Sequence, residues 1–124
     1  RPLVSDVTVL TSRSADDLME VGVQKTPEKQ VLDLANLSAQ EGLEGVVCSA
    51  AETRALRGLM PEDFCLVTPG IRRLEDAAGD QKRVVGPAEA IANGSDYLVV
   101  GRPITGAADP LAALDAFNLA ISRA

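Results

Sequence analysis

The stretch Gly45-Val46-Val47-Cys48-Ser49 decides the fold class of this 124-residue chain. A short, continuous apolar run after a glycine is typical of a strand that is buried on both faces in a parallel sheet. Ser49 and Glu52 form an S-x-x-E pattern, which predicts a capping box at the start of a helix that runs to about Leu59. A buried strand followed directly by a helix is the repeating unit of α/β folds.

The same unit precedes this stretch on its N-terminal side. Residues 3–10 predict a strand, and Ser14 can cap a short helix that ends near Gly22. Thr26-Pro27 predicts the start of a longer helix ending near Gly42, because threonine is a good N-cap and proline suits the first helical position. The residues expected on the sheet-facing side of this longer helix are Val31, Leu34, Ala35 and Ser38.

Two further units follow on the C-terminal side. Residues 64–68 and 97–100 predict strands, with a helix between Pro87 and Gly94. Asp109-Pro110 predicts the start of a final helix. Its expected apolar stripe consists of Leu111, Leu114, Phe117 and Ile121. Residues 69–86 form a polar stretch longer than a usual connection from strand to helix, which indicates a functional loop.

Four strand–helix units predict one α/β domain with parallel strands over residues 1–124. An open sheet of four strands leaves two unpaired edges and an exposed apolar face. A closed barrel of this type needs eight units. We therefore expect a (βα)4 half of a TIM-type (βα)8 barrel.

The composition narrows the possible classes of function. A net charge of −6 opposes binding along nucleic acid, and aromatic residues, which could stack on bases, make up only 2%. The absence of histidine excludes histidine-dependent triads and leaves no material for a zinc site, so no metal is expected. No stretch resembles a membrane span or a secretion signal, so we expect a cytoplasmic protein. Cys48 and Cys65 are expected to be unpaired thiols in the core.

The exit of the last predicted strand carries the candidate binding site. It reads Val99-Val100-Gly101-Arg102-Pro103, in which Gly101 lets the backbone approach a ligand and Arg102 offers a guanidinium to a phosphate. The backbone N–H groups beyond it can also point at an anion. The alternative is that Gly101 only turns the chain and that Arg102 is a solvated surface charge.

Five strings place this exit in a wider pattern. They are Val-Thr-Val-Leu-Thr-Ser (7–12), Gly-Val-Val-Cys-Ser (45–49), Val-Thr-Pro-Gly-Ile-Arg (67–72), Gly-Asp-Gln (79–81) and Val-Gly-Arg-Pro-Ile-Thr (100–105). Their order and spacing resemble the C-terminal half of the orotidine 5'-monophosphate decarboxylase family, and the resemblance covers essentially the whole chain. Members of that family are (βα)8 barrels that convert orotidine 5'-monophosphate to uridine 5'-monophosphate without a metal or organic cofactor.

The resemblance implies roles for particular residues. Arg72, Gly101 and Arg102 would hold the phosphate, Gln81 would close from the long loop and bridge phosphate and pyrimidine, and Thr11 would line the nucleotide pocket. Binding energy at the phosphate could then assist the distant chemistry. Weaker candidates are Ser12 and Pro69, and surface charges are expected at Arg73, Lys82 and Arg83.

The same resemblance implies that catalytic groups are missing. In the family, decarboxylation depends on lysines and aspartates of the N-terminal half, including an Asp-x-Lys-x-x-Asp string. Here Asp80-Gln81-Lys82 begins similarly but continues Arg83-Val84-Val85, so no catalytic residue is assigned. We expect the isolated chain to bind the nucleotide and to be inactive as a decarboxylase.

Three residues depart from the family pattern. Ser5 and Asp6 stand where apolar or small residues are usual, and Arg13 stands where methionine is common. A buried charge at Asp6 would be costly. Asp6 therefore either faces water at an exposed edge or marks an altered site.

Two rival interpretations remain open. One is another phosphate-binding barrel enzyme, such as a sugar-phosphate decarboxylase or epimerase, although the Gly-Asp-Gln string argues against it. The other is a non-catalytic half-barrel that binds phosphorylated ligands and pairs with itself or with a separate N-terminal half. We expect a homo-oligomer or such a complex.

Overall fold

The computed structural model describes residues 2–10, 13–73 and 85–123. Four parallel strands form one sheet in the order β1-β2-β3-β4. The strands are β1 (Ser5–Val7), β2 (Gly45–Val47), β3 (Cys65–Thr68) and β4 (Tyr97–Leu98). Strand order follows chain order, as it does in one half of a (βα)8 barrel. The predicted α/β class with four parallel strands is confirmed.

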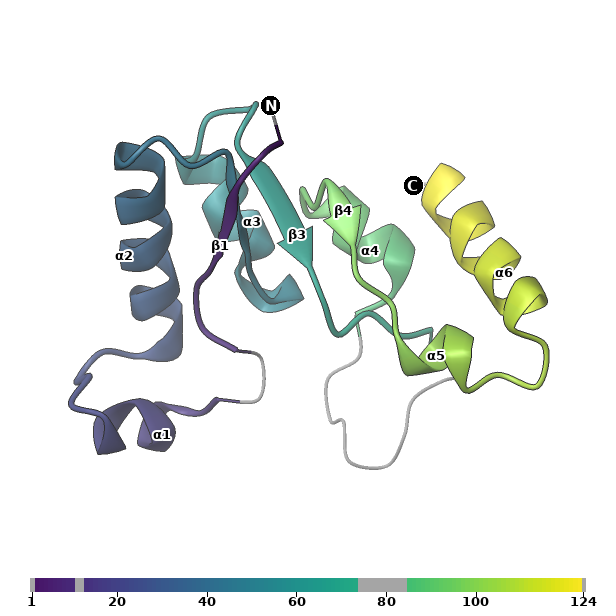
Figure 1. The fold of residues 1–124 in the computed structure, drawn as a ribbon, viewed down its shortest axis with the longest axis horizontal. Coiled ribbons are helices and arrows are strands. Elements are labelled where there is room, and N and C mark those ends of the chain that lie inside the picture. Colours follow the sequence, from purple (N-terminus) through teal and green to yellow (C-terminus); the bar gives the residue numbers. More distant parts are fainter. Residues whose placement is uncertain (1, 11–12, 74–84, 124) are drawn as a thin grey trace.

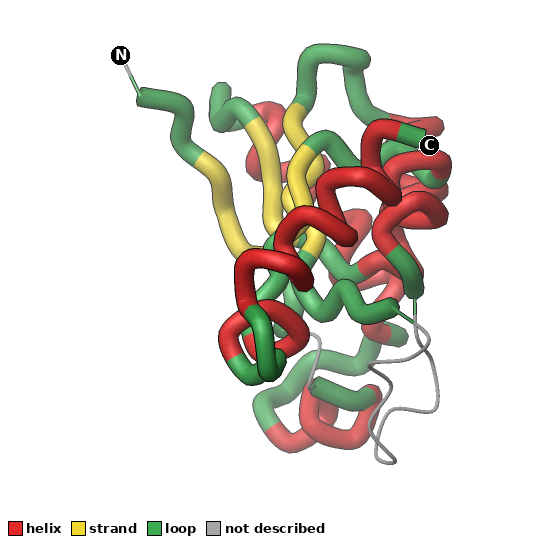
Figure 2. Tube along the Cα trace, turned by 90° about the vertical axis from the view of Figure 1, so that its right-hand side faces the viewer, coloured by secondary structure: helices red, strands yellow, loops and turns green. Residues whose placement is uncertain are grey.

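Six helices complete the described fold (Figure 1). They are α1 (Ala15–Glu20), α2 (Pro27–Gln40), α3 (Ala50–Leu59), α4 (Pro87–Ala92), α5 (Arg102–Thr105) and α6 (Pro110–Ser122). Figures 1 and 2 show α1 and α5 at one end of the sheet, the end toward which the strands run. In the described ranges, no helix is long and apolar enough to cross a membrane.

The helices bury one face of the sheet. Val46 and Leu66 are fully buried in a core cluster with Val31 and Ala35 of α2 and Leu56 of α3. A second cluster is centred on Ile71, Ala90 and Phe117, with Ala50, Val85, Leu98, Val100 and Ile104 packed against it. Alternate residues of a strand point to opposite faces, so the residues between these buried positions face away from the helices.

We call that other side of the sheet the open face. Its central row runs across all four strands through Val7, Val47, Val67 and Tyr97, which are neighbours in the strand register. Val7 is 50% exposed and Tyr97 is 63% exposed, whereas Val47 and Val67 are half-buried. No described helix covers this apolar row, in agreement with the interpretation as half of a barrel.

The outer strands are shorter than predicted. The sequence predicts a strand over residues 3–10, and the structure has Ser5–Val7. The sequence predicts another over residues 97–100, and the structure has Tyr97–Leu98. Each is an edge strand whose extent depends on one neighbour, because β1 pairs with β2 and β4 pairs with β3. One backbone hydrogen bond continues the pairing past the C-terminal end of each edge strand. The Thr8 N–H donates to the Val47 carbonyl (3.3 Å), and the Val99 N–H donates to the Thr68 carbonyl (2.9 Å).

Asp6 lies exposed on edge strand β1, which agrees with the first of the two interpretations offered for it. Its Oδ2 also accepts a hydrogen bond from the buried Ser38 hydroxyl of α2 at 3.0 Å. This bond explains how a polar residue fits among the core positions of α2. Val31 and Ala35 are buried as predicted, and Leu34 is half-buried.

The capping box predicted at Ser49 and Glu52 is wrong. Ser49 is the N-cap residue of α3, but its side chain makes no capping bond. Both side chains instead line a small cavity. The structure has a capping box at Ser14, whose hydroxyl accepts from the Asp17 N–H (3.3 Å) while Asp17 accepts from the Ser14 N–H (2.8 Å). The bond from the Ser14 backbone lowers the pKa of Asp17.

The stripe predicted for the final helix is also partly wrong. Phe117 is buried and Ile121 is half-buried, but Leu111 is 75% exposed and Leu114 is 40% exposed, whereas Ala113 is buried. Apolar residues occur all round α6, so its periodicity could not identify the buried face. Contacts with α4 and α5 select the side that carries alanine and phenylalanine.

Cys48 and Cys65 are unpaired thiols, as predicted. Cys48 is buried, but Cys65 is half-buried and faces the open side of the sheet, so the prediction that both lie in the core holds for Cys48. Desolvation raises the pKa of both thiols above the ordinary value. Both are therefore protonated and poorly nucleophilic near neutral pH.

Arg57 of α3 joins three segments at the end of the sheet where the strands begin. Its guanidinium donates to the carbonyls of Gly94 (3.0 and 3.1 Å) and Phe64 (3.0 Å), and to Asp96 Oδ2 (2.6 Å). The same Asp96 oxygen accepts from the Leu66 N–H at 2.8 Å. A Cβ at Gly94 would lie 2.8 Å from the Arg57 side chain, so glycine is required for this close approach.

We expect Arg57→Met to lower the free energy of unfolding by about 1–3 kcal/mol, because several partly buried acceptors lose a charged donor together. The measurement is urea unfolding followed by circular dichroism. Arg54→Met is the matched control, since Arg54 lies on the same helix, is exposed and donates to Asn93. A change of less than about 0.5 kcal/mol is expected there. Equal losses in the two variants would contradict a special role for Arg57.

Candidate functional site

The exits of β3 and β4 are adjacent, because the two strands pair in parallel. Beyond β3 the chain turns at Gly70, whose φ of +74° lies in the left-handed region that favours glycine. Beyond β4 it reaches Gly101, the N-cap residue of α5. Arg72 and Arg102 thus follow glycine turns on neighbouring strands, at the same edge of the sheet.

The side chains of these two arginines are available for an anion. Arg102 is exposed and Arg72 is half-buried. Among the residues that the structure describes, neither guanidinium has a hydrogen-bond or ion-pair partner. In a chain with 18 acidic residues and a net charge of −6, these two guanidinium groups place positive charge at one edge of the sheet.

The short helix α5 shapes the backbone beside Arg102. The Gly101 carbonyl accepts from the N–H groups of Ile104 (2.9 Å) and Thr105 (3.0 Å), and Pro103 is buried within the first turn. A Cβ built on Gly101 would meet no atom within 4 Å, so open space adjoins this glycine. The backbone here can be approached by a ligand. Sequence reasoning missed α5 as a helix, although Pro103 one residue after Arg102 is a helix-start signal.

The second hydrophobic cluster lies beneath the two exits. Ile71 precedes Arg72, Val100 precedes Gly101, and Ile104 follows in α5; all three belong to or pack against this cluster. The Arg72 N–H donates to the Val85 carbonyl at 3.2 Å, which ties the β3 exit to the segment that leads into α4. Apolar packing on one side of the chain therefore supports the polar residues on the other.

Buried hydroxyls anchor the end of β3. The hydroxyl of Thr68, the last residue of the strand, is hydrogen-bonded to the hydroxyls of Ser95 (2.5 Å) and of Thr53 in α3 (3.4 Å). The Thr53 hydroxyl also donates to the Ser49 carbonyl at 3.0 Å. All three hydroxyl side chains are buried. This network holds the start of the Pro69-Gly70 turn in place.

The structure brings together part of the predicted site. Arg72, Gly101 and Arg102 lie at adjacent strand exits, with half-buried Pro69 at the start of the β3 exit. The other predicted positions, Thr11, Ser12, Gln81, Lys82 and Arg83, lie outside the described residues.

Arg73 differs from its prediction as a surface charge. Its guanidinium carbon lies 5.0 Å from the centroid of the Phe117 ring, and its side chain is half-buried. The sequence carried no signal for this contact, because the two residues are far apart along the chain.

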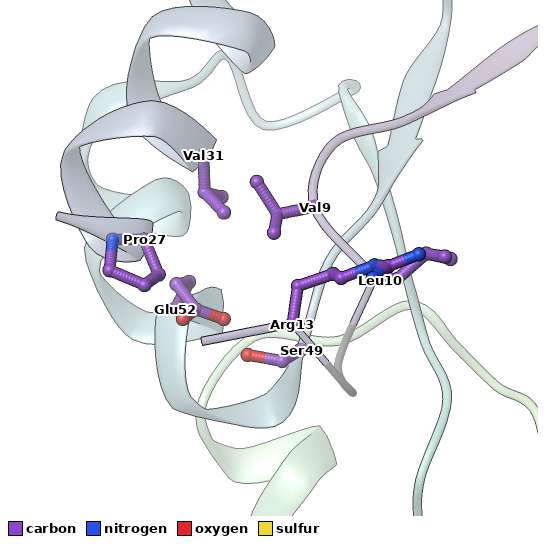
Figure 3. Close-up of a pocket in the computed structure, with 7 residues that line it drawn as sticks. All are labelled: Val9, Leu10, Arg13, Pro27, Val31, Ser49 and Glu52. Atoms are coloured by element: carbon purple, nitrogen blue, oxygen red, sulfur yellow. The ribbon is translucent and has the colours of Figure 1, made fainter. Parts of the chain in front are cut away.

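A cavity of about 60 Å³ lies at the exit of β1, between the starts of α2 and α3 (Figure 3). Its lining residues are Val9, Leu10, Arg13, Pro27, Val31, Ser49 and Glu52. Val9 and Val31 point toward one another in Figure 3. The volume has room for a few water molecules and not for a nucleotide. Within the described ranges, no group of three or more potential metal ligands is present.

Comparisons with known proteins agree in one family. Residues 1–117 match the orotidine 5'-phosphate decarboxylase / HUMPS family. The orotidine 5'-phosphate decarboxylase of Chromobacterium violaceum is 59% identical over 98% of this chain and 49% of that protein. The enzyme of the same name from Idiomarina loihiensis is 58% identical over 91% of this chain and 49% of that protein.

A solved structure gives the same result. The orotidine 5'-phosphate decarboxylase from Lactobacillus acidophilus superposes with a TM-score of 0.83 at 39% identity, covering 97% of this chain and 49% of that one. The chain spans about half the length of the curated relatives that it matches.

Proposed function

The chain belongs to the orotidine 5'-phosphate decarboxylase / HUMPS family, and on that premise we propose that it is the C-terminal, phosphate-binding half of an orotidine 5'-monophosphate decarboxylase. The whole enzyme would convert orotidine 5'-monophosphate to uridine 5'-monophosphate in pyrimidine synthesis, as a carboxy-lyase of the cytoplasm without metal or organic cofactor. The observation that carries this proposal is that Arg72 and Arg102 lie at two adjacent strand exits, and that neither guanidinium has a partner within residues 2–10, 13–73 and 85–123.

The chemistry of these exits suits the phosphate of a nucleotide. A guanidinium donates through a planar fork that matches phosphate oxygens, and two such groups can neutralise a dianion. Gly101 leaves its backbone open to a ligand oxygen. Gln81 and Thr11 are proposed to contact the nucleotide as well, Gln81 by bridging its phosphate and pyrimidine. Energy gained at the phosphate can then stabilise the transition state elsewhere on the substrate.

Assignment to the C-terminal half rests on the order of the five family strings. In this assignment the proton-donating lysine and its neighbouring aspartates lie in the other half, since the chain has no Asp-x-Lys-x-x-Asp string. That half would also supply four more strands. It would pair with the edges of β1 and β4 and cover the open face, on which Val7 and Tyr97 are at least half exposed.

A second candidate is a non-catalytic half-barrel in which two copies cover each other's open faces. The exposed row and the two free edges favour it, because a second copy also supplies four strands. A sugar phosphate is the less favoured ligand. The relatives at 59% and 58% identity are orotidine 5'-phosphate decarboxylases.

Arg102→Ala should weaken the binding of uridine 5'-monophosphate about 10- to 100-fold, since a charge-assisted hydrogen bond contributes about 1.5–3 kcal/mol. Titration calorimetry measures the change. Arg123→Ala is the control, because Arg123 is exposed at the far end of α6 from α5 (Figure 1). Equal affinity of Arg102→Ala and the parent would refute the proposed phosphate site.

The isolated 124-residue chain should release no carbon dioxide from orotidine 5'-monophosphate, because the groups that protonate the product carbon are absent. The assay follows substrate loss with extensively purified protein. Turnover by the parent chain that disappears in Arg102→Ala would overturn this expectation, because such activity would belong to the chain and not to a contaminant.

Cys65 can report whether the open face is covered. It is half-buried on that face, whereas Cys48 is 1% exposed among the helices. We expect iodoacetamide at about pH 9 to modify Cys65 and not Cys48 in the isolated chain, slowly because the pKa of Cys65 is raised. Cys65 should become protected in the full-length protein. Equal labelling in both forms would contradict burial of the open face, and solution mass distinguishes a second copy from the other half.

A further inference from the structure

We propose that Arg73 is a positioning residue for the phosphate site: its contact with the ring of Phe117 fastens the exit of β3 to α6 and thereby fixes the place of Arg72. The inference rests on the proposed function for the role of Arg72. The contact itself is a property of the fold. From the sequence, Arg73 is expected to be only a surface charge.

The geometry is that of a cation–π interaction. The Arg73 guanidinium carbon lies 5.0 Å from the centroid of the Phe117 ring, within the distance of about 6 Å at which such pairs attract. Phe117 is 1% exposed, so its ring is held firmly by the core. Arg73 is half-buried, and partial removal from water strengthens the attraction between a cation and a ring.

Residues 71–73, at the exit of β3, are held by three different interactions. Ile71 is 1% exposed within the cluster that contains Phe117. The Arg72 N–H donates to the Val85 carbonyl at 3.2 Å. Arg73 packs on the ring. The backbone of this exit is therefore fixed on both sides of Arg72, whose guanidinium is left without a partner among the described residues.

The cluster that contains Phe117 also supports the exit of β4. Leu98, Val100 and Ile104 pack against the cluster of Phe117, and Ile104 lies in α5 directly after the Arg102-Pro103 pair. Phe117 thus belongs to the cluster against which residues of both strand exits pack. A change in the seating of Arg73 on this ring would alter the spacing of Arg72 relative to Arg102, and a phosphate held by both arginines is sensitive to that spacing.

The test uses the full-length protein with two readouts, affinity for uridine 5'-monophosphate and hydrogen exchange of the Arg72 amide. Arg73→Met keeps most of the side-chain length and removes the charge. We expect it to raise the dissociation constant about fivefold and to speed exchange of the Arg72 amide about fivefold, as for a locally loosened exit. Arg73→Lys keeps a cation over the ring and should restore most of both values.

Two further variants separate positioning from charge. Arg123→Met removes a positive charge from the end of α6 and should leave both readouts unchanged. Phe117→Leu keeps every charge and removes the ring, so it should impair both readouts. Adding Arg73→Met to Phe117→Leu should then cause a smaller further change than Arg73→Met causes in the parent protein. If Phe117→Leu does not fold, Arg73→Met, Arg73→Lys and Arg123→Met still test whether Arg73 positions the exit of β3.

An unchanged rate of Arg72 amide exchange in Arg73→Met would overturn the inference, whatever the affinity. Faster exchange with Arg73→Lys no better than Arg73→Met would also overturn it, because the cation would then be irrelevant. Failure of the proposed function looks different: the parent protein would not bind the nucleotide at all, while the exchange experiment would still report on the contact between Arg73 and Phe117.

Discussion

Parallel pairing of β3 with β4 is the constraint on which the candidate site depends. Parallel neighbours end at the same edge of a sheet, so the residues that follow them meet in space although long stretches of chain separate them. Here the pairing of Thr68 with Leu98 places the Gly70 turn beside the Gly101 turn. Each turn is followed by an arginine. The site is therefore a consequence of strand order and needs no special backbone beyond its glycines.

At the two strand exits, apolar side chains pack into the second hydrophobic cluster, and polar side chains point the other way. Residues of the second hydrophobic cluster alternate with the polar residues of the exits, as Ile71 does with Arg72. Hydroxyls of Thr53, Thr68 and Ser95 satisfy one another within the core just before the turn. This packing supports the backbone of both strand exits, on which the two arginines of the candidate site lie.

The open face explains why the fold is incomplete by itself. Helices cover one side of the sheet, while the row from Val7 to Tyr97 and both edge strands have no partner among the described residues. Exposed apolar surface and free strand edges are costly in water and favour association. The similarity to about half of each relative's length accords with this picture. In the proposed function, completion of the barrel would join the candidate phosphate site to the catalytic groups of the other half.

The sequence by itself determined the four strands, every helix except α5, their order along the chain, the family, and the glycine and arginine residues at the strand exits, because local patterning and short motifs encode these features. Tertiary structure alone decided the lengths of the edge strands, the buried side of α6, and the contact of Arg73 with Phe117. An edge strand extends only as far as its neighbour pairs with it. A helix that is apolar all round has no preferred side until other helices pack on it. A ring and a cation distant in the chain meet only when the fold brings them together.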